Sequence, residues 1–172
     1  MRISTATPKN CLSLAAVCMS LVLASFAANA AEPSATEQKP YEWSAALISF
    51  DDATNTAVFR ANVVSHANID GLDRLKEGDR LILIWSGRAW ANGVLDLARD
   101  PELTPDALSL PVEFVSSRSD GKYIDFRTYI PESAVETISK IQAGMRVTGT
   151  SPRMATDWHN GIVSLRAYND VD

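Results

Sequence analysis

Histidine is scarce in this chain, and the two histidines mark the few places where acid–base or metal chemistry could occur. His66 and His159 are the only histidines among the 172 residues. In DWHNG (157–161), a loop can bring the Asp157 carboxylate and the His159 imidazole to one side, as an acid–base pair or a metal site needs. The alternative interpretation is an exposed loop histidine without a chemical role.

Other catalytic signatures do not occur in the sequence. It contains no Gly-x-Ser-x-Gly elbow, no His-Glu-x-x-His, no glycine-rich phosphate loop and no calcium loop. Ser65 precedes His66, but neighbours on a strand point to opposite faces. We therefore expect no catalytic residue, no metal and no cofactor. A small hydrolase or metal-dependent enzyme that uses His159 and Asp157 is the alternative.

The N-terminal residues predict export. Arg2 and Lys9 are followed by an apolar stretch over 11–27 and by Ala-x-Ala at 28–30, which is typical of a signal peptide (1–30) cleaved after Ala30. A retained anchor is the alternative, although the stretch is slightly short for a spanning helix and no basic cluster follows it. We expect a periplasmic or secreted protein with no stable membrane insertion after cleavage.

The composition of the mature chain narrows the function further. Both cysteines, Cys11 and Cys18, lie in the signal segment, so the mature chain has no disulfide and no thiol nucleophile. Two of the 16 basic residues also lie there, which leaves 14 basic against 21 acidic residues, a formal charge of −7. That charge disfavours nucleic acid and other polyanions as partners. Residues 31–40 are small and polar, and we expect a flexible leader there.

The remaining chain, which we expect to be a single domain over 41–172, consists of two similar halves. Three segments match in the same order at offsets of 66 to 68 residues: 69–81 with 135–147, 59–63 with 126–130, and 90–97 with 158–165. Three ordered matches at nearly one offset indicate a tandem duplication into repeats 41–105 and 108–172.

Each repeat has the same order of hydrophobic periods. Alternation with period two predicts a β-hairpin with one buried face. The period then changes to three or four over 69–75 and 135–141, which predicts a short helix in each half that stops at Gly78 and Gly144. Two more strands follow. The repeat unit is therefore predicted to be strand–strand–helix–strand–strand.

The segments YIPESAVETISKIQAGMRVTGTS (129–151) and LKEGDRLILI (75–84) resemble the AbrB/SpoVT-like swapped-hairpin family. In that family a strand ending in Ile-Pro runs into a short helix and a Gly-Asp turn, and two units interleave their hairpins. The resemblance implies a mainly β fold, a small closed β-barrel with pseudo-two-fold symmetry that one duplicated chain completes as a monomer. Phe59 and Phe126 are then expected at equivalent buried positions.

Transcription factors of that family bind DNA through basic residues of the first hairpin. Here the hairpins carry basic and acidic residues side by side: Arg60, Arg118, Lys122 and Arg127 with Asp51, Asp52, Asp120 and Asp125. Together with the predicted export, this mixture argues against nucleic acid as a partner, because a fold alone does not determine function.

Each half also contains the motif Trp-x-Asn-Gly, at 90–93 and at 158–161. Asn-Gly favours a tight turn with positive φ before a returning strand, and Trp90 and Trp158 at equivalent places could cover one end of the barrel. The alternative is a pair of exposed aromatic platforms for a sugar, a peptide or peptidoglycan. Trp43 and Trp85 have no counterparts, and Trp85 is expected in the core.

The loop before the last strand is longer in the second half, SPRMATDWHNG (151–161) against SGRAWANG (86–93). Loops tolerate divergence better than core strands, so we place the binding site there. The candidate contacts are Arg153, Asp157, Trp158 and His159, together with Trp90 of the shorter loop. We expect an exported, non-enzymatic binding or scaffold module of the cell envelope, with an envelope protein or an uncharged polymer as its partner.

The signal features give a first testable prediction. The native protein should begin at or near Ala31, because the small residues at Ala28 and Ala30 suit the signal-peptide cleavage site. Intact-mass measurement of the protein isolated from its own cells checks this, and a mass that includes the Met1 segment would show that cleavage does not occur.

Overall fold

The structure is a computed structural model that describes residues 39–64, 69, 71–98, 108–118, 121–153, 155 and 157–169. These residues all belong to one compact unit. The predicted signal peptide and most of the predicted leader lie outside the described residues. Within the described ranges, no helix has the length and apolar character needed to cross a membrane.

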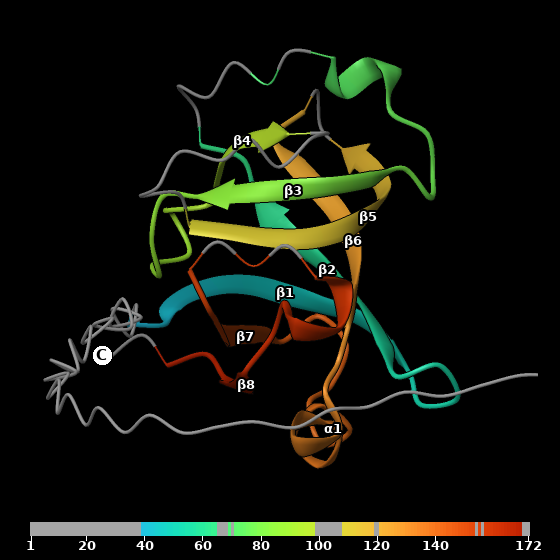
Figure 1. Ribbon diagram of the computed structural model, residues 1–172, viewed down its shortest axis with the longest axis vertical. Coiled ribbons are helices and arrows are strands. Elements are labelled where there is room, and N and C mark those ends of the chain that lie inside the picture. The colour runs from blue at the N-terminus through green and yellow to red at the C-terminus, as the bar shows by residue number, and fades with distance from the viewer. Residues whose placement is uncertain are drawn as a thin grey trace, which may run out of the picture. The chain divides into compact units, whose positions relative to one another are not determined.

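Most of the described residues belong to one antiparallel sheet of eight strands (Figure 1). In chain order the elements are β1 (Tyr41–Asp51), β2 (Thr56–Asn62), η1 (Leu72–Arg74), β3 (Arg80–Trp85), β4 (Val94–Ala98), β5 (Leu108–Arg118), β6 (Tyr123–Tyr129), α1 (Glu132–Ile138), β7 (Arg146–Ser151), η2 (Trp158–Asn160) and β8 (Ser164–Ala167). The two η elements are single 3₁₀ turns. The strand order across the sheet is β4-β3-β5-β6-β2-β1-β7-β8.

The prediction of a closed barrel is wrong, although the prediction of a mainly β fold is confirmed. The sheet is open, with β4 and β8 as its two end strands. Other segments of the chain cover the two end strands. The chain after β2 reaches the outer edge of β4, where Val63 and Val94 form a parallel bridge and the Val64 N–H donates to the Val94 carbonyl at 3.0 Å. At the other end α1 packs against β8. β4 and β8 therefore do not pair with each other, and each is covered by another segment of the chain.

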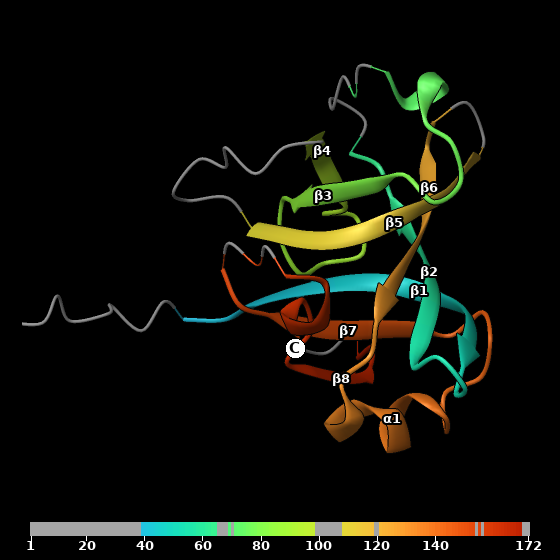
Figure 2. The ribbon, with the colours of Figure 1, turned by 45° about the vertical axis from the view of Figure 1, so that its right-hand side comes forward.

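The strand order has a two-fold pattern, because it reads the same from both ends when β1–β4 are exchanged with β5–β8. The halves also exchange strands. β3 of the first half pairs with β5 of the second, and β7 of the second half pairs with β1 of the first. Figure 2 shows the result, with β3 and β5 above β1 and β7 while β2 and β6 run between the two pairs. Neither half can complete its own part of the sheet.

The pseudo-two-fold axis passes between β2 and β6, where Phe59 lies directly opposite Phe126. Both side chains are fully buried, as the repeat predicts, and their ring centroids are 5.7 Å apart. Trp43 of β1 stacks on Trp85 of β3 at 5.4 Å although several strands separate β1 from β3 in the sheet. The sheet therefore folds over on itself, and the aromatic residues of its inner face form the centre of the core.

The two halves fill equivalent core positions with different side chains. In the first pair of exchanged strands Trp43 lies opposite Gly149, and in the second Leu110 lies opposite Leu83. A Cβ atom on Gly149 would overlap the indole ring of Trp43, so the large ring requires glycine there. One tryptophan and one glycine thus replace two leucines, which keeps the packed volume similar. Trp85, fully buried, confirms the prediction that it belongs to the core.

The helix prediction is correct for the second half and wrong for the first. α1 begins after Pro131 and buries Ala134 and Ile138, whereas the first half has only η1 at the equivalent place in the described residues. Gly71 directly precedes η1 with φ +82°, a left-handed conformation that does not continue into an α-helix. Gly78 and Gly144 adopt the predicted left-handed conformation, with φ of +89° and +88°, but neither glycine stops a helix, because α1 ends at Ile138 and η1 at Arg74.

The shared core gives a second prediction. Phe59→Ala and Phe126→Ala should each lower the free energy of unfolding by about 3–5 kcal/mol, because each removes a fully buried ring. The double variant should cost less than the sum of the two, because the rings touch each other. Urea unfolding followed by tryptophan fluorescence measures all three values. Additive losses would mean that the two halves have independent cores.

Candidate functional site

The predicted binding loop between β7 and β8 is organised around Asp157. Its Oδ1 atom accepts a hydrogen bond of 2.8 Å from the backbone N–H of His159, which caps the start of η2. The same oxygen lies 3.6 Å from His159 Nδ1. Both side chains remain largely exposed, with 58% of Asp157 and 68% of His159 accessible. The predicted approach of these two side chains therefore occurs, on the surface and not in a buried site.

Ring packing fixes this loop to the sheet. The His159 imidazole meets the ring of Tyr129, at the end of β6, edge to face with 4.8 Å between centroids. Trp158 is half-buried and Arg153 is exposed, while Ala155 between them is buried. The loop thus has a buried anchor and an exposed polar rim.

Trp90 belongs to a different cluster. The guanidinium of Arg146 lies 4.6 Å from the centroid of the Trp90 ring, a cation–π contact. The hydroxyl of Tyr168 accepts a hydrogen bond from the Trp90 backbone N–H at 3.4 Å. These contacts hold the shorter loop against β7 and the residue that follows β8, and the Trp90 side chain remains partly exposed.

The prediction that Asn-Gly forms a turn with positive φ is wrong in both loops. Gly161 has φ −69°, and Gly93 is not among the glycines with positive φ. Close approach requires glycine at Gly93 instead, and it leaves a side chain at Gly161 only a tight fit. A Cβ atom on Gly93 would overlap the carbonyl oxygen of Asn62, and one on Gly161 would lie 3.1 Å from the Leu110 side chain.

The described residues of the loop bring no further metal-ligating side chain to Asp157 and His159. Within the described ranges, no three His, Cys, Asp or Glu side chains are grouped so that they could hold a metal ion. His66, the second histidine of the enzyme hypothesis, lies outside the described residues. The described partners of His159 are Asp157 and Tyr129.

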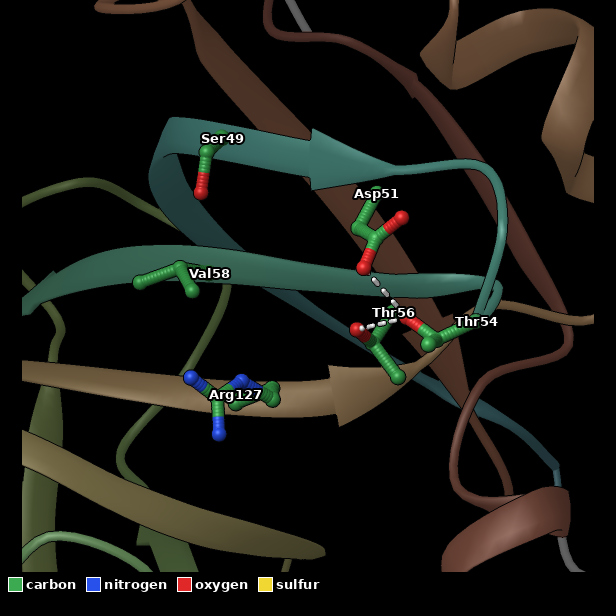
Figure 3. Close-up of a pocket in the computed structure, with 6 residues that line it drawn as sticks. All are labelled: Ser49, Asp51, Thr54, Thr56, Val58 and Arg127. Atoms are coloured by element: carbon green, nitrogen blue, oxygen red, sulfur yellow. Dashed lines mark hydrogen bonds between the residues drawn. The ribbon is translucent and has the colours of Figure 1, made fainter.

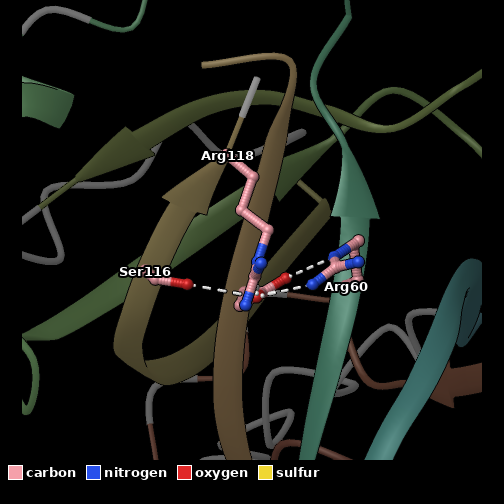
Figure 4. A network of polar contacts seen from close by, with 4 residues as sticks. Arg60, Ser116 and Arg118 are labelled. Carbon is pink, nitrogen blue, oxygen red and sulfur yellow. Dashed lines mark hydrogen bonds and ion pairs between the residues drawn. The ribbon is translucent and has the colours of Figure 1, made fainter. Parts of the chain in front are cut away.

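A second polar site, on the outer face of β6, was not predicted from the sequence (Figure 4). Asp125 is only 3% exposed, and its carboxylate accepts from three side chains. Arg60 donates from Nε and Nη2 at 2.7 and 3.0 Å, Arg118 donates from Nε at 2.9 Å, and the Ser116 hydroxyl lies at 3.1 Å. This carboxylate is fully engaged inside the protein.

The charges of this site determine its ionisation. Burial raises the pKa of Asp125, but the hydrogen bonds from Arg60, Arg118 and Ser116 outweigh burial, so that the net effect lowers the pKa below its usual value. The same contact raises the pKa of Arg60. Asp125 is therefore ionised throughout the neutral range. The sequence shows these charges on adjacent hairpins, but only the register between β2 and β6 shows that they meet.

Comparisons of the chain with protein-family models, with curated proteins and with solved structures found no match.

The Asp125 site gives a third prediction. Asp125→Asn should lower the free energy of unfolding at neutral pH by about 1–3 kcal/mol, because two charge-assisted hydrogen-bond partners lose the buried carboxylate. A lowered native pKa stabilises the fold above the unfolded-state value of about 3.9, and this contribution disappears as the pH falls through the native pKa. The difference between wild type and variant should therefore shrink below about pH 4.

Urea unfolding at neutral and acidic pH measures this difference. Asp52→Asn, which changes an exposed carboxylate, serves as the matched control and should have little effect at either pH. An equal loss for Asp125→Asn at both pH values would contradict the ion-pair explanation.

Proposed function

We propose that this chain is a non-enzymatic binding module of the cell envelope, and that its contact surface is the exposed rim of the loop between β7 and β8. The observation that carries the proposal is that η2 is held in place while the polar side chains at its start stay largely exposed. Asp157 caps η2 and His159 packs on Tyr129, yet both polar side chains are mostly exposed. A loop held in one conformation loses less entropy when a partner binds.

The exposure of Asp157 and His159 supports binding over catalysis. Active sites commonly exclude water from the reacting groups, whereas water reaches both of these side chains. In addition, one oxygen of Asp157 already accepts the His159 backbone N–H. A small hydrolase is the second candidate, favoured by the 3.6 Å approach of the two side chains.

The partner is proposed to be an envelope protein or an uncharged polymer. The mature chain has a formal charge of −7, which disfavours nucleic acid and other polyanions. The N-terminal sequence favours a periplasmic or secreted location. The exchange of strands within one chain supports a monomer, and it also fits descent of both halves from an AbrB/SpoVT-like swapped-hairpin unit.

The fourth prediction tests the loop surface. Immobilised wild-type protein should retain an envelope component from a solubilised envelope fraction, identified by mass spectrometry. The double variant Arg153→Ala/His159→Phe should retain at least about tenfold less of it, since exposed polar contacts are lost while a ring at position 159 keeps the packing on Tyr129. Its melting temperature should stay close to that of the wild type.

The matched control is Arg74→Ala/Lys140→Ala, which removes two exposed basic side chains elsewhere. It should retain the component like the wild type. Undiminished capture by the loop variant, or an equal loss in the control, would contradict the proposal. Hydrolysis of p-nitrophenyl acetate that is abolished by His159→Ala alone would favour the hydrolase.

A further inference from the structure

The Asp125 site has a counterpart at the equivalent place of the other half, on the outer face of β1, β2 and β6. The pseudo-two-fold axis relates the residues of the two sites in four pairs: Ser116 with Ser49, Arg118 with Asp51, Asp125 with Val58, and Arg60 with Arg127. The two serines and the two arginines are equivalent. The carboxylate is replaced by valine, and one arginine is replaced by an aspartate.

The strand registers establish this equivalence. In β5–β6 the ladder is interrupted between Phe114 and Ser116, and Ser116 then lies opposite Asp125. In β1–β2 it is interrupted between Leu47 and Ser49, and Ser49 then lies opposite Val58. Across β2–β6, Arg60 faces Asp125 and Val58 faces Arg127. The two backbones thus present the same arrangement around a different central side chain.

A hollow of about 330 Å³ lies at the counterpart site (Figure 3). It is lined by Ser49, Asp51, Thr54, Thr56, Val58 and Arg127. Figure 3 shows Val58 between Ser49 on one side and Arg127 on the other, the place that the Asp125 carboxylate takes in the first site. The hollow therefore lies where the other half holds a carboxylate.

Arg127 is held less tightly than its equivalent Arg60. Its Nη1 and Nη2 atoms lie 3.4 Å from Glu113 and 3.9 Å from Glu77, and a third of its side chain is exposed. Arg60, by contrast, forms a two-pronged contact with Asp125 at 2.7 and 3.0 Å. The partly buried contact with Glu113 is long for a hydrogen bond and Glu77 is exposed, so Arg127 keeps donor capacity for another carboxylate.

Asp51 places a negative charge in the hollow, where the first site has the cation of Arg118. Its two oxygens accept hydrogen bonds from the Ala53 N–H at 3.0 Å and the Thr54 hydroxyl at 2.9 Å, and each oxygen has a second lone pair for a ligand. The Thr54 and Ala53 hydrogen bonds lower the pKa of Asp51, so it is ionised at neutral pH. Hydroxyl groups of Ser49 and Thr56 complete a polar wall.

We propose that this hollow binds a small zwitterion, such as a free α-amino acid or a short peptide. The ligand's carboxylate takes the place of the Asp125 carboxylate and accepts from Arg127 and Ser49. Its ammonium group takes the place of the Arg118 cation and donates to Asp51. Val58 contacts the apolar part of the ligand between these two groups.

The charges around the hollow exclude simpler ligands. Among the described residues, a plain anion meets the repulsion of Asp51, Glu113 and Glu77, while Arg127 is the one basic side chain that lines the hollow. A plain cation is repelled by Arg127. No aromatic side chain is among the described lining residues, which removes the stacking platform that sugar rings commonly use. This site is independent of the loop between β7 and β8, so the two proposals can fail separately.

The fifth prediction tests the hollow by isothermal titration calorimetry of the full exported chain at low ionic strength. The probes are L-alanine and L-alanyl-L-alanine, compared with sodium acetate and ethylamine hydrochloride, which each carry one charge. At least one zwitterion should bind saturably, about tenfold or more tighter than either half-ligand. Arg127→Gln and Asp51→Asn should each weaken binding by about tenfold or more.

The matched controls are Asp73→Asn and Arg74→Gln, which change one exposed acidic and one exposed basic residue of η1. Both variants should bind like the wild type. Val58→Asp should abolish binding, because its carboxylate occupies the ligand's place beside Arg127. If that variant does not fold, Arg127→Gln and Asp51→Asn, the variants of residues that line the hollow, still test the proposal. No saturable heat up to about 10 mM of either zwitterion would overturn the proposal, as would acetate binding equally well or unchanged affinity in both lining variants.

Discussion

The antiparallel pairing of β2 with β6 places Phe59 directly opposite Phe126 and joins the two halves of the chain along their shared axis. The rest of the sheet extends from this pair on both sides, through β1 and β5 to the exchanged strands. A slip of one residue between β2 and β6 would turn one of the two rings to the outer face and separate Arg60 from Asp125. The core and the outer polar site therefore depend on the same register.

The exchange of strands lets two halves diverge without losing one core. Trp43 and Gly149 fill the core positions in one exchanged strand pair that Leu110 and Leu83 fill in the other. Such a replacement needs both partners to change, because a Cβ on Gly149 would overlap the indole ring. The stacked Trp43 and Trp85 then fill the space between strands that are not neighbours in the sheet. Divergence in the core is thus compensated locally, within one pair of contacting strands.

Periodic patterns in the sequence predict the parts of the fold that depend on local preference. The buried hairpin phenylalanines, the αL glycines Gly78 and Gly144 and the second-half helix were all predicted correctly. The closed barrel was wrong because closure depends on how end strands meet distant segments, as Val94 meets Val63. For the same reason the approach of Asp157 to His159, two residues apart, was predictable, whereas the meeting of Arg60 with Asp125 required a strand register.

The pseudo-symmetry separates residues that serve the fold from residues that are free to serve a function. Where both halves keep the same side chain, as with Phe59 and Phe126, the shared core accounts for it. The replacement of the Asp125 carboxylate by Val58 has no such explanation, because neither side chain belongs to the hydrophobic core. In one site Arg60 and Ser116 donate hydrogen bonds to the Asp125 carboxylate. In the other site the equivalent Arg127 and Ser49 line a hollow. Arg127 has longer contacts with Glu113 and Glu77 than Arg60 has with Asp125, and this difference between the two halves is the basis of the proposed ligand site.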